Sequence, residues 1–128
     1  MNHASVFWGF YESAELRLIN KYLSPDLPVI ELGGSLGIVS SHIISRLKQP
    51  FTIVEANPML IETIRINTGN YNHHHVMVQV VNKAISYSGN SVSFAVSNNN
   101  TESSIANKSE TGLNNKNIIT VPATTLAV

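Results

Sequence analysis

A glycine-rich turn between two acidic residues is the feature of this sequence best suited to hold a ligand. Glu31 precedes the turn and Glu55 follows it, each near the end of a short apolar run. The turn itself contains Gly33, Gly34, Ser35 and Gly37. Glycine lets the backbone turn sharply and lets a ligand approach its N–H groups with no Cβ in the way. Glu55 is placed like the acid that accepts hydrogen bonds from ribose hydroxyls in open α/β sheets, so we expect a ligand that contains adenosine.

The identity of the turn residues disfavours a dinucleotide as that ligand. The fingerprint G-x-G-x-x-G requires glycines where this chain has Ser35 and Ile38. The carboxylate of Glu31 would repel a pyrophosphate, whereas it would attract a cationic ligand, such as one with a sulfonium and an ammonium group. An NAD-dependent oxidoreductase is therefore the less favoured alternative.

The same turn also matches the nucleophile elbow G-x-S-x-G of α/β-hydrolases over residues 33–37. That elbow requires an acid and then a histidine further along the chain. No aspartate follows Ser35, and the later histidines, at 42 and 73–75, come too early for that fold. Consecutive residues of an extended segment point to alternate faces, so at most two of the histidines at 73–75 could share a metal ion. We interpret them as a polar loop and expect no metal site.

Charge and composition exclude several classes of partner. Eight Lys and Arg residues balance eight Asp and Glu residues, and no basic run is present. The sequence therefore lacks the electrostatic pattern of a nucleic-acid binder or of a protein that binds anionic membranes. It contains no cysteine, which excludes disulfides and thiolate chemistry. With no signal peptide at its N-terminus and no long apolar stretch, we expect a cytoplasmic protein.

Hydrophobic periodicity predicts the elements that must position these residues. We expect a helix over 11–23, a strand over 29–32, and a helix after the turn with Val39, Ile43, Ile44 and Leu47 on its buried face. A strand follows over 51–55, and Asn57-Pro58 begins a helix that Gly69-Asn70 ends near Thr68. Another strand is expected over 76–81. Residues 91–96 and 118–121 predict a hairpin-like pair, and 11 of the 21 residues between 97 and 117 are Asn or Ser, which indicates a loop. This order favours an α/β fold with a parallel sheet covered by helices.

Several segments together resemble one enzyme family. The turn from Glu31 to Gly37 resembles the E/D-x-G-x-x-x-G turn of class I S-adenosylmethionine-dependent methyltransferases. Residues 54–58 are similar to the acid-Pro-Asn-Pro segment of the FkbM family, with Ala56 in place of the usual proline. Asn67 matches an Asn near the end of the family's second helix, and Gly9-Phe10-Tyr11-Glu12 resembles the segment before its first helix. Residues 82–86 (Asn-Lys-Ala-Ile-Ser) and the run from Val121 to Leu126 resemble later family segments in the same order.

The resemblance implies a role for each matching residue. Gly33, Gly34, Ser35 and Gly37 would line the methionine end of S-adenosyl-L-methionine, and Glu31 would attract its ammonium group. Glu55 would hold the ribose hydroxyls. The adenine ring would lie between Ala56 and Asn57 on one side and Asn82, Lys83 or Ala84 on the other.

The resemblance also implies the domain organisation and the reaction. We expect one partial Rossmann-like methyltransferase domain over 1–128, with an N-terminal helix region (1–28), a cofactor-binding βαβαβ unit (29–86) and a β-hairpin with the Asn/Ser-rich loop (87–128). The family's acceptor-side Asp-x-Glu-Gly type motif would follow Val128, so we expect the N-terminal half of such a domain, without an assigned catalytic residue. The expected reaction is O-methylation of a small molecule or saccharide, and the alternative is a non-catalytic nucleotide-binding half-domain.

Overall fold

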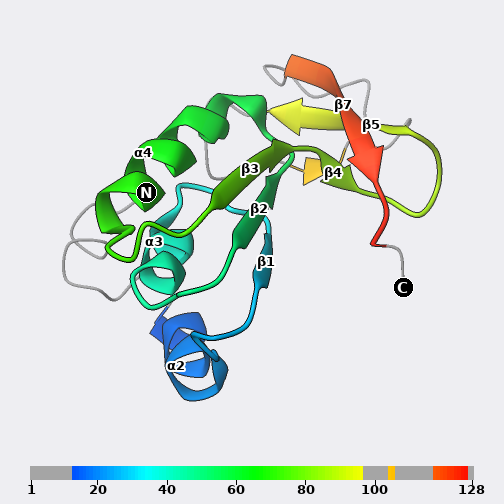
Figure 1. Cartoon of the computed structure of the whole chain (residues 1–128). Coiled ribbons are helices and arrows are strands. Elements are labelled where there is room, and N and C mark those ends of the chain that lie inside the picture. The colour runs from blue at the N-terminus through cyan, green and yellow to red at the C-terminus, as the bar shows by residue number, and fades with distance from the viewer. Residues whose placement is uncertain (1–12, 97–103, 106–116, 127–128) are drawn as a thin grey trace.

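The three predicted apolar runs form a parallel sheet. The computed structural model describes residues 13–96, 104–105 and 117–126. In it, β1 (Val29–Leu32), β2 (Phe51–Glu55) and β3 (Val78–Asn82) lie in the order β1-β2-β3, with both pairs of neighbours parallel (Figure 1). The register places Glu31 opposite Ile53 and Glu55 opposite Asn82. Polar residues of all three strands therefore gather toward the carboxyl ends of the strands, where open α/β sheets bind their ligands.

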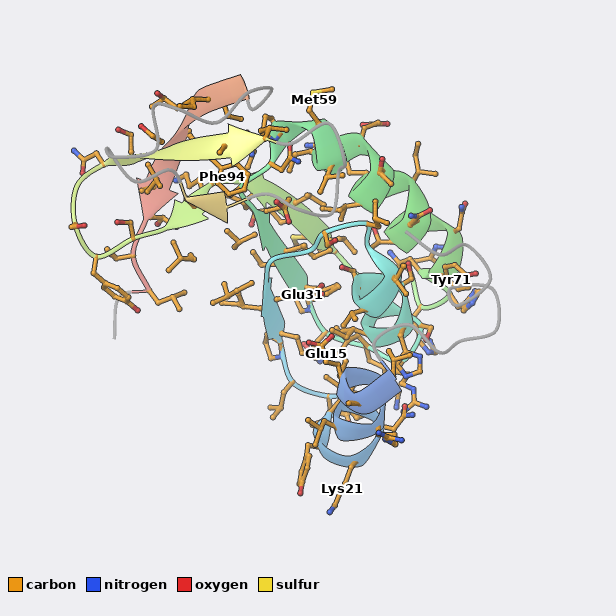
Figure 2. The ribbon with its side chains drawn as sticks, turned by 180° about the vertical axis from the view of Figure 1, so that it is seen from behind. Glu15, Lys21, Glu31, Met59, Tyr71 and Phe94 are labelled. Atoms are coloured by element: carbon orange, nitrogen blue, oxygen red, sulfur yellow. The ribbon has the colours of Figure 1, made fainter. Side chains whose placement is uncertain are left out.

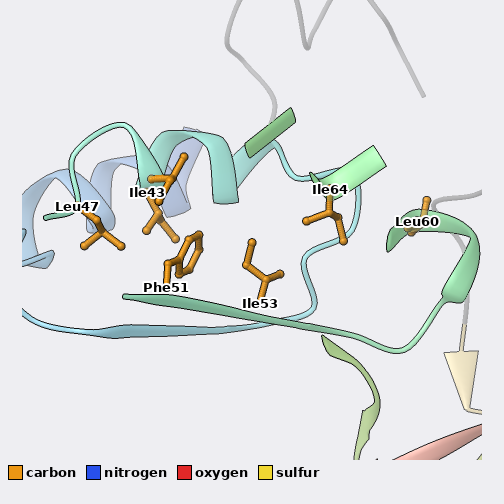
Figure 3. Packing of buried hydrophobic residues seen from close by; sticks show 7 residues of the cluster. Ile43, Leu47, Phe51, Ile53, Leu60 and Ile64 are labelled. Carbon is orange, nitrogen blue, oxygen red and sulfur yellow. The ribbon is translucent and has the colours of Figure 1, made fainter. Parts of the chain in front are cut away.

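Helices cover one face of this sheet and enclose the core. α2 (Ser13–Tyr22) precedes β1, α3 (Ile38–Ile44) connects β1 with β2, and α4 (Ile61–Tyr71) connects β2 with β3 (Figure 1). Side chains of α3 and α4 point toward β2 (Figure 3). The buried cluster consists of Ile43, Ile44, Leu47, Phe51, Ile53, Leu60 and Ile64. Each fully buried aliphatic or aromatic side chain stabilises the fold by about 1.5–3 kcal/mol relative to its exposed state, so this layer is the main source of stability for the sheet.

The predicted helix start at Asn57-Pro58 is confirmed, but its predicted end is wrong. The side-chain oxygen of Asn57 accepts a hydrogen bond from the N–H of Met59 at 3.0 Å, and a short 3₁₀ helix, η1 (Pro58–Leu60), leads into α4. α4 continues through Gly69 to Tyr71. The chain leaves the helix at Asn72, because its side chain bonds both the N–H and the C=O of Val76 (3.0 and 2.9 Å) and so closes the turn into β3.

Two further boundaries differ from the prediction. α3 ends at Ile44, although Leu47 beyond it is fully buried as expected. β3 begins at Val78, two residues later than predicted, because Val76 is held in the turn by Asn72. The three expected strands and the helices between them are nevertheless all present, so the alternation of elements was predicted correctly.

The last third of the described chain forms a separate mixed sheet. Its strands are β4 (Ala84–Ile85), β5 (Ser91–Val96), β6 (Ser104–Ile105) and β7 (Asn117–Thr124), in the order β4-β7-β5-β6. The predicted antiparallel pairing of 91–96 with 118–121 is confirmed, with Val92 opposite Val121. β4 pairs in parallel with β7, which the sequence did not predict. Most of the Asn/Ser-rich segment, like residues 9–12, lies outside the described residues.

The face of β1 that points away from the helices is exposed to solvent. β1 is an edge strand of the three-stranded sheet, and on this face Ile30 and Leu32 are 61% and 48% exposed. The alternate residues Val29 and Glu31 are only partly exposed, because they point to the other face, on which α3 and the core lie.

Among the described residues, no helix has the length and apolar character needed to cross a bilayer.

Candidate functional site

The glycine turn links β1 to α3 through three residues in the left-handed backbone region. Gly33, Ser35 and Gly37 have φ values of 85°, 49° and 77°. The N–H of Gly33 donates to the carbonyl of Val54 at 2.7 Å, and the N–H of Gly37 donates to the carbonyl of Gly34 at 2.8 Å. A left-handed conformation costs a residue other than glycine about 1–2 kcal/mol. Ser35 therefore needs a compensating contact.

Glu55 supplies that contact. Its Oε2 accepts a hydrogen bond from the N–H of Ser35 at 2.8 Å, and its Oε1 accepts one from the N–H of Asn57 at 2.7 Å. The residue is only 7% exposed. Hydrogen bonds to an ionised acceptor are stronger than neutral ones, so this carboxylate ties the glycine turn to the start of η1. A carboxylate has about four lone-pair positions, so each oxygen retains a position for a further donor.

The glycines of the turn serve different purposes. A Cβ at Gly34 would lie 2.6 Å from Cγ2 of Ile53 and 3.0 Å from Cδ1 of Ile64, and a Cβ at Gly37 would lie 3.2 Å from Cα of Ile64. These two glycines are needed where the turn packs on the core. A Cβ at Gly33 would meet nothing within 4 Å among the described residues. Gly33 is thus the position where backbone conformation, rather than packing, requires glycine.

Glu31 lies on the α3 side of the turn. The hydroxyl of Ser40 donates to Oε2 of Glu31 at 2.5 Å, and Ser40 itself is fully buried in α3. From α4, the amide of Asn67 donates to the carbonyl of Leu36 in the turn at 2.7 Å. Ser40 was missed by sequence reasoning, because no motif marks a buried serine of a helix. Asn67 was noticed only through the family resemblance.

The residues expected around adenine separate into two groups. Asn82 donates from Nδ2 to the carbonyls of Glu55 and Ala56, at 2.9 and 3.0 Å, and Asn57 is buried beside them. Ala56, Asn57 and Asn82 are therefore brought together with Glu55. Lys83 is exposed beyond the end of β3, and the side chain of Ala84 is buried in the second sheet. Of the three residues expected on this side of adenine, Asn82 is thus the one whose side chain bonds the backbone beside Glu55.

A pocket of about 350 Å³ opens between α2, the end of β1 and the glycine turn. Its described walls include the apolar side chains of Leu18, Leu36 and Val39 and the carboxylic side chains of Glu15 and Glu31. Residues 33–35 of the turn also line it. Glu55 is not among these lining residues, but its carboxylate bonds the N–H of Ser35, which is one of them.

A second pocket, of about 450 Å³, lies along the three helices and includes Leu16, His42, Asn67 and Tyr71. The Nε2 atom of His42 in α3 lies 2.7 Å from Oδ1 of Asn20 in α2, and this hydrogen bond links the two helices. Burial, and after it the positive charge of Arg46, lowers the pKa of His42 below its ordinary value.

The histidines at 73–75 are exposed in the turn before β3, and no group of three metal-ligating side chains occurs in the part of the chain described.

Comparison with protein-family models, with curated proteins and with solved structures found no match for this chain. The features of this chain that bear on its function are therefore the arrangement of Glu31, Glu55 and the glycine turn, and the pocket beside the turn.

Proposed function

We propose that the chain binds S-adenosyl-L-methionine at the carboxyl ends of β1 and β2, as the cofactor-binding part of a class I methyltransferase domain of FkbM type. One observation carries this proposal. The Glu55 carboxylate is held against the backbone of the glycine turn by the 2.8 Å bond from Ser35. This contact supports a single site in which the acid would hold a ribose and the turn would hold the rest of the ligand.

The described residues would divide the ligand among three places. The amino-acid end would enter the 350 Å³ pocket, where Glu31 lies beside the glycine turn. The ribose hydroxyls would donate to the lone pairs of Glu55 that the backbone leaves available. The adenine edge would meet Ala56, Asn57 and Asn82, which hydrogen bonds already hold around the end of β2.

Electrostatics favours this ligand over a dinucleotide. The pocket has two carboxylic side chains, and none of its lining residues in the described part of the chain is basic. A pyrophosphate placed there would be repelled, whereas a sulfonium and an ammonium group would be attracted. When bound, S-adenosylmethionine supplies a methyl group activated for transfer to a nucleophile. The protein's contribution would be to orient that methyl group toward a small-molecule or saccharide hydroxyl.

Isothermal titration calorimetry with S-adenosylhomocysteine, with NAD as the comparison ligand, tests this proposal. We expect micromolar binding of S-adenosylhomocysteine and none of NAD. Circular dichroism must show that the same sample is folded. Absence of S-adenosylhomocysteine binding by the folded chain would overturn the proposal, and binding of NAD instead would favour an oxidoreductase. Transfer from radiolabelled S-adenosylmethionine to a panel of saccharides then separates an enzyme from a non-catalytic binding domain.

A further inference from the structure

The pocket beside the glycine turn contains a carboxylate that the sequence did not point to. Glu15 lies in the first turn of α2 and lines the same pocket as Glu31 of β1. Figure 2 shows Glu15 at the end of α2 that lies toward Glu31, with Lys21 at the opposite end. Two elements distant from each other along the chain therefore each contribute an acid to one cavity.

We infer that Glu15 is a second binding residue for a cationic group, namely the ammonium at the amino-acid end of the ligand. This inference rests on the proposed function and extends it, since it adds a helix outside the βαβαβ unit to the cofactor site. It also makes α2 a determinant of which adenosine-containing ligands the chain accepts. Ligands that carry an ammonium group at this end would be preferred over those that lack one.

The contacts of the two carboxylates support a division of roles. Glu31 accepts a hydrogen bond from the buried hydroxyl of Ser40, which fixes its position. The Glu15 carboxylate has neither an ion pair nor a hydrogen bond with any residue in the described part of the chain. A negative charge in the first turn of a helix gains about 0.3–1 kcal/mol from the helix dipole. That gain explains an acid at this end of α2, but it does not require the acid to line a pocket.

The surroundings of Glu15 strengthen its effect on a cation. Apolar side chains, including Leu18 and Leu36, form much of the pocket wall, and a charge is attracted more strongly beside apolar walls than in open water. The basic residues of α2, Arg17 and Lys21, are not among the pocket's lining residues. Glu15 is itself exposed, so its attraction for a ligand should be modest and should weaken as salt concentration rises.

The experiment compares two variants and two ligands by calorimetry at low ionic strength. Glu15→Gln removes the proposed charge, and Glu62→Gln removes an exposed charge of α4 that does not line the pocket. S-Adenosylhomocysteine carries the ammonium group, and 5′-methylthioadenosine lacks the entire amino-acid end. We expect Glu15→Gln to bind S-adenosylhomocysteine about two- to fivefold more weakly than the wild-type chain. Its affinity for 5′-methylthioadenosine should equal that of the wild type, and Glu62→Gln should change neither affinity.

Each other outcome overturns the inference in a recognisable way. If Glu15→Gln and Glu62→Gln bind S-adenosylhomocysteine equally well, Glu15 does not contact the ammonium group. If Glu15→Gln weakens both ligands alike, the residue supports the fold of α2 instead. If the wild-type chain binds 5′-methylthioadenosine but not S-adenosylhomocysteine, the pocket does not take the amino-acid end. If it binds neither, the proposed function fails and the inference fails with it.

Discussion

The Glu55 side chain stabilises the fold through hydrogen bonds, in addition to its proposed role in binding a ribose. Its two oxygens accept hydrogen bonds from the N–H groups of Ser35, in the turn after β1, and of Asn57, at the start of η1. Replacement by glutamine would turn an amide NH₂ toward one of these donors and remove the negative charge. We expect Glu55→Gln to lower the free energy of unfolding by about 1.5–3 kcal/mol, as for other hydrogen bonds to charged groups. Urea denaturation measures this change.

Glu62→Gln provides the matched control for that measurement. Glu62 pairs with Arg65 at 3.7 Å on the exposed face of α4, and exposed pairs of this kind are worth about 0.3–0.5 kcal/mol. Equal unfolding free energies for the Glu55 and Glu62 variants would contradict the role assigned to Glu55. Affinity measurements on Glu55 variants must therefore be made at temperatures where the variant is fully folded.

Some of the candidate site could be predicted residue by residue, and some could not. Glu55 follows from its position at the end of a predicted strand, and the glycines follow from the special backbone conformations of a strand-to-helix turn. The sequence did not reveal that Gly34 is required by the side chains of Ile53 and Ile64, because that contact joins three separate elements. The pocket position of Glu15 was equally hidden, since it depends on how α2 packs beside β1.

At the scale of elements, the glycine turn lies so close to β2 and α4 that position 34 has no room for a side chain. We expect Gly34→Ala to destabilise the protein by about 1–3 kcal/mol, the usual cost of overpacking. The cause is the 2.6 Å separation between the new Cβ and Cγ2 of Ile53. Thermal or urea denaturation tests this expectation. A variant as stable as the wild type would show that the side chains of Ile53 and Ile64 can move away from the turn at no cost.

The glycine inside α4 predicts the opposite result. Gly69 lies in the helix, its φ is not positive, and a Cβ there would meet nothing within 4 Å among the described residues. Alanine is a better helix former than glycine by about 0.8–1.0 kcal/mol. We therefore expect Gly69→Ala to raise the free energy of unfolding by nearly that amount, measured beside Gly34→Ala under the same conditions. Destabilisation by Gly69→Ala would mean that α4 ends before this residue, as the sequence had suggested.

Element boundaries show which local signals are strong. Asn57-Pro58 began its helix as predicted, because the cap hydrogen bond and the fixed φ of proline act within a few residues. Gly69-Asn70 did not end it, because one glycine costs a helix less than the surrounding helical hydrogen bonds contribute. The effective stop was Asn72, whose side chain bonds both backbone groups of Val76.

At the scale of the whole molecule, two small sheets are joined in one chain. The parallel sheet was predictable, because its strands alternate with helices and each carries its own apolar run. The pairing of β5 with β7 was also predictable from alternation. The parallel pairing of β4 with β7 was not, since β4 has only two residues and its partner is distant in sequence. Such a short pairing depends on tertiary packing, which local patterns do not encode.

The bond from Asn82 to the carbonyls of Glu55 and Ala56 has a consequence for the thermodynamics of any ligand bound there. This bond and those of Glu55 already fix the groups around the end of β2 relative to one another. The entropy lost in ordering them was therefore lost during folding, and a ligand would not have to offset it again. A ligand that binds to these preorganised groups requires no conformational change in them. Its association rate is therefore not limited by such a change.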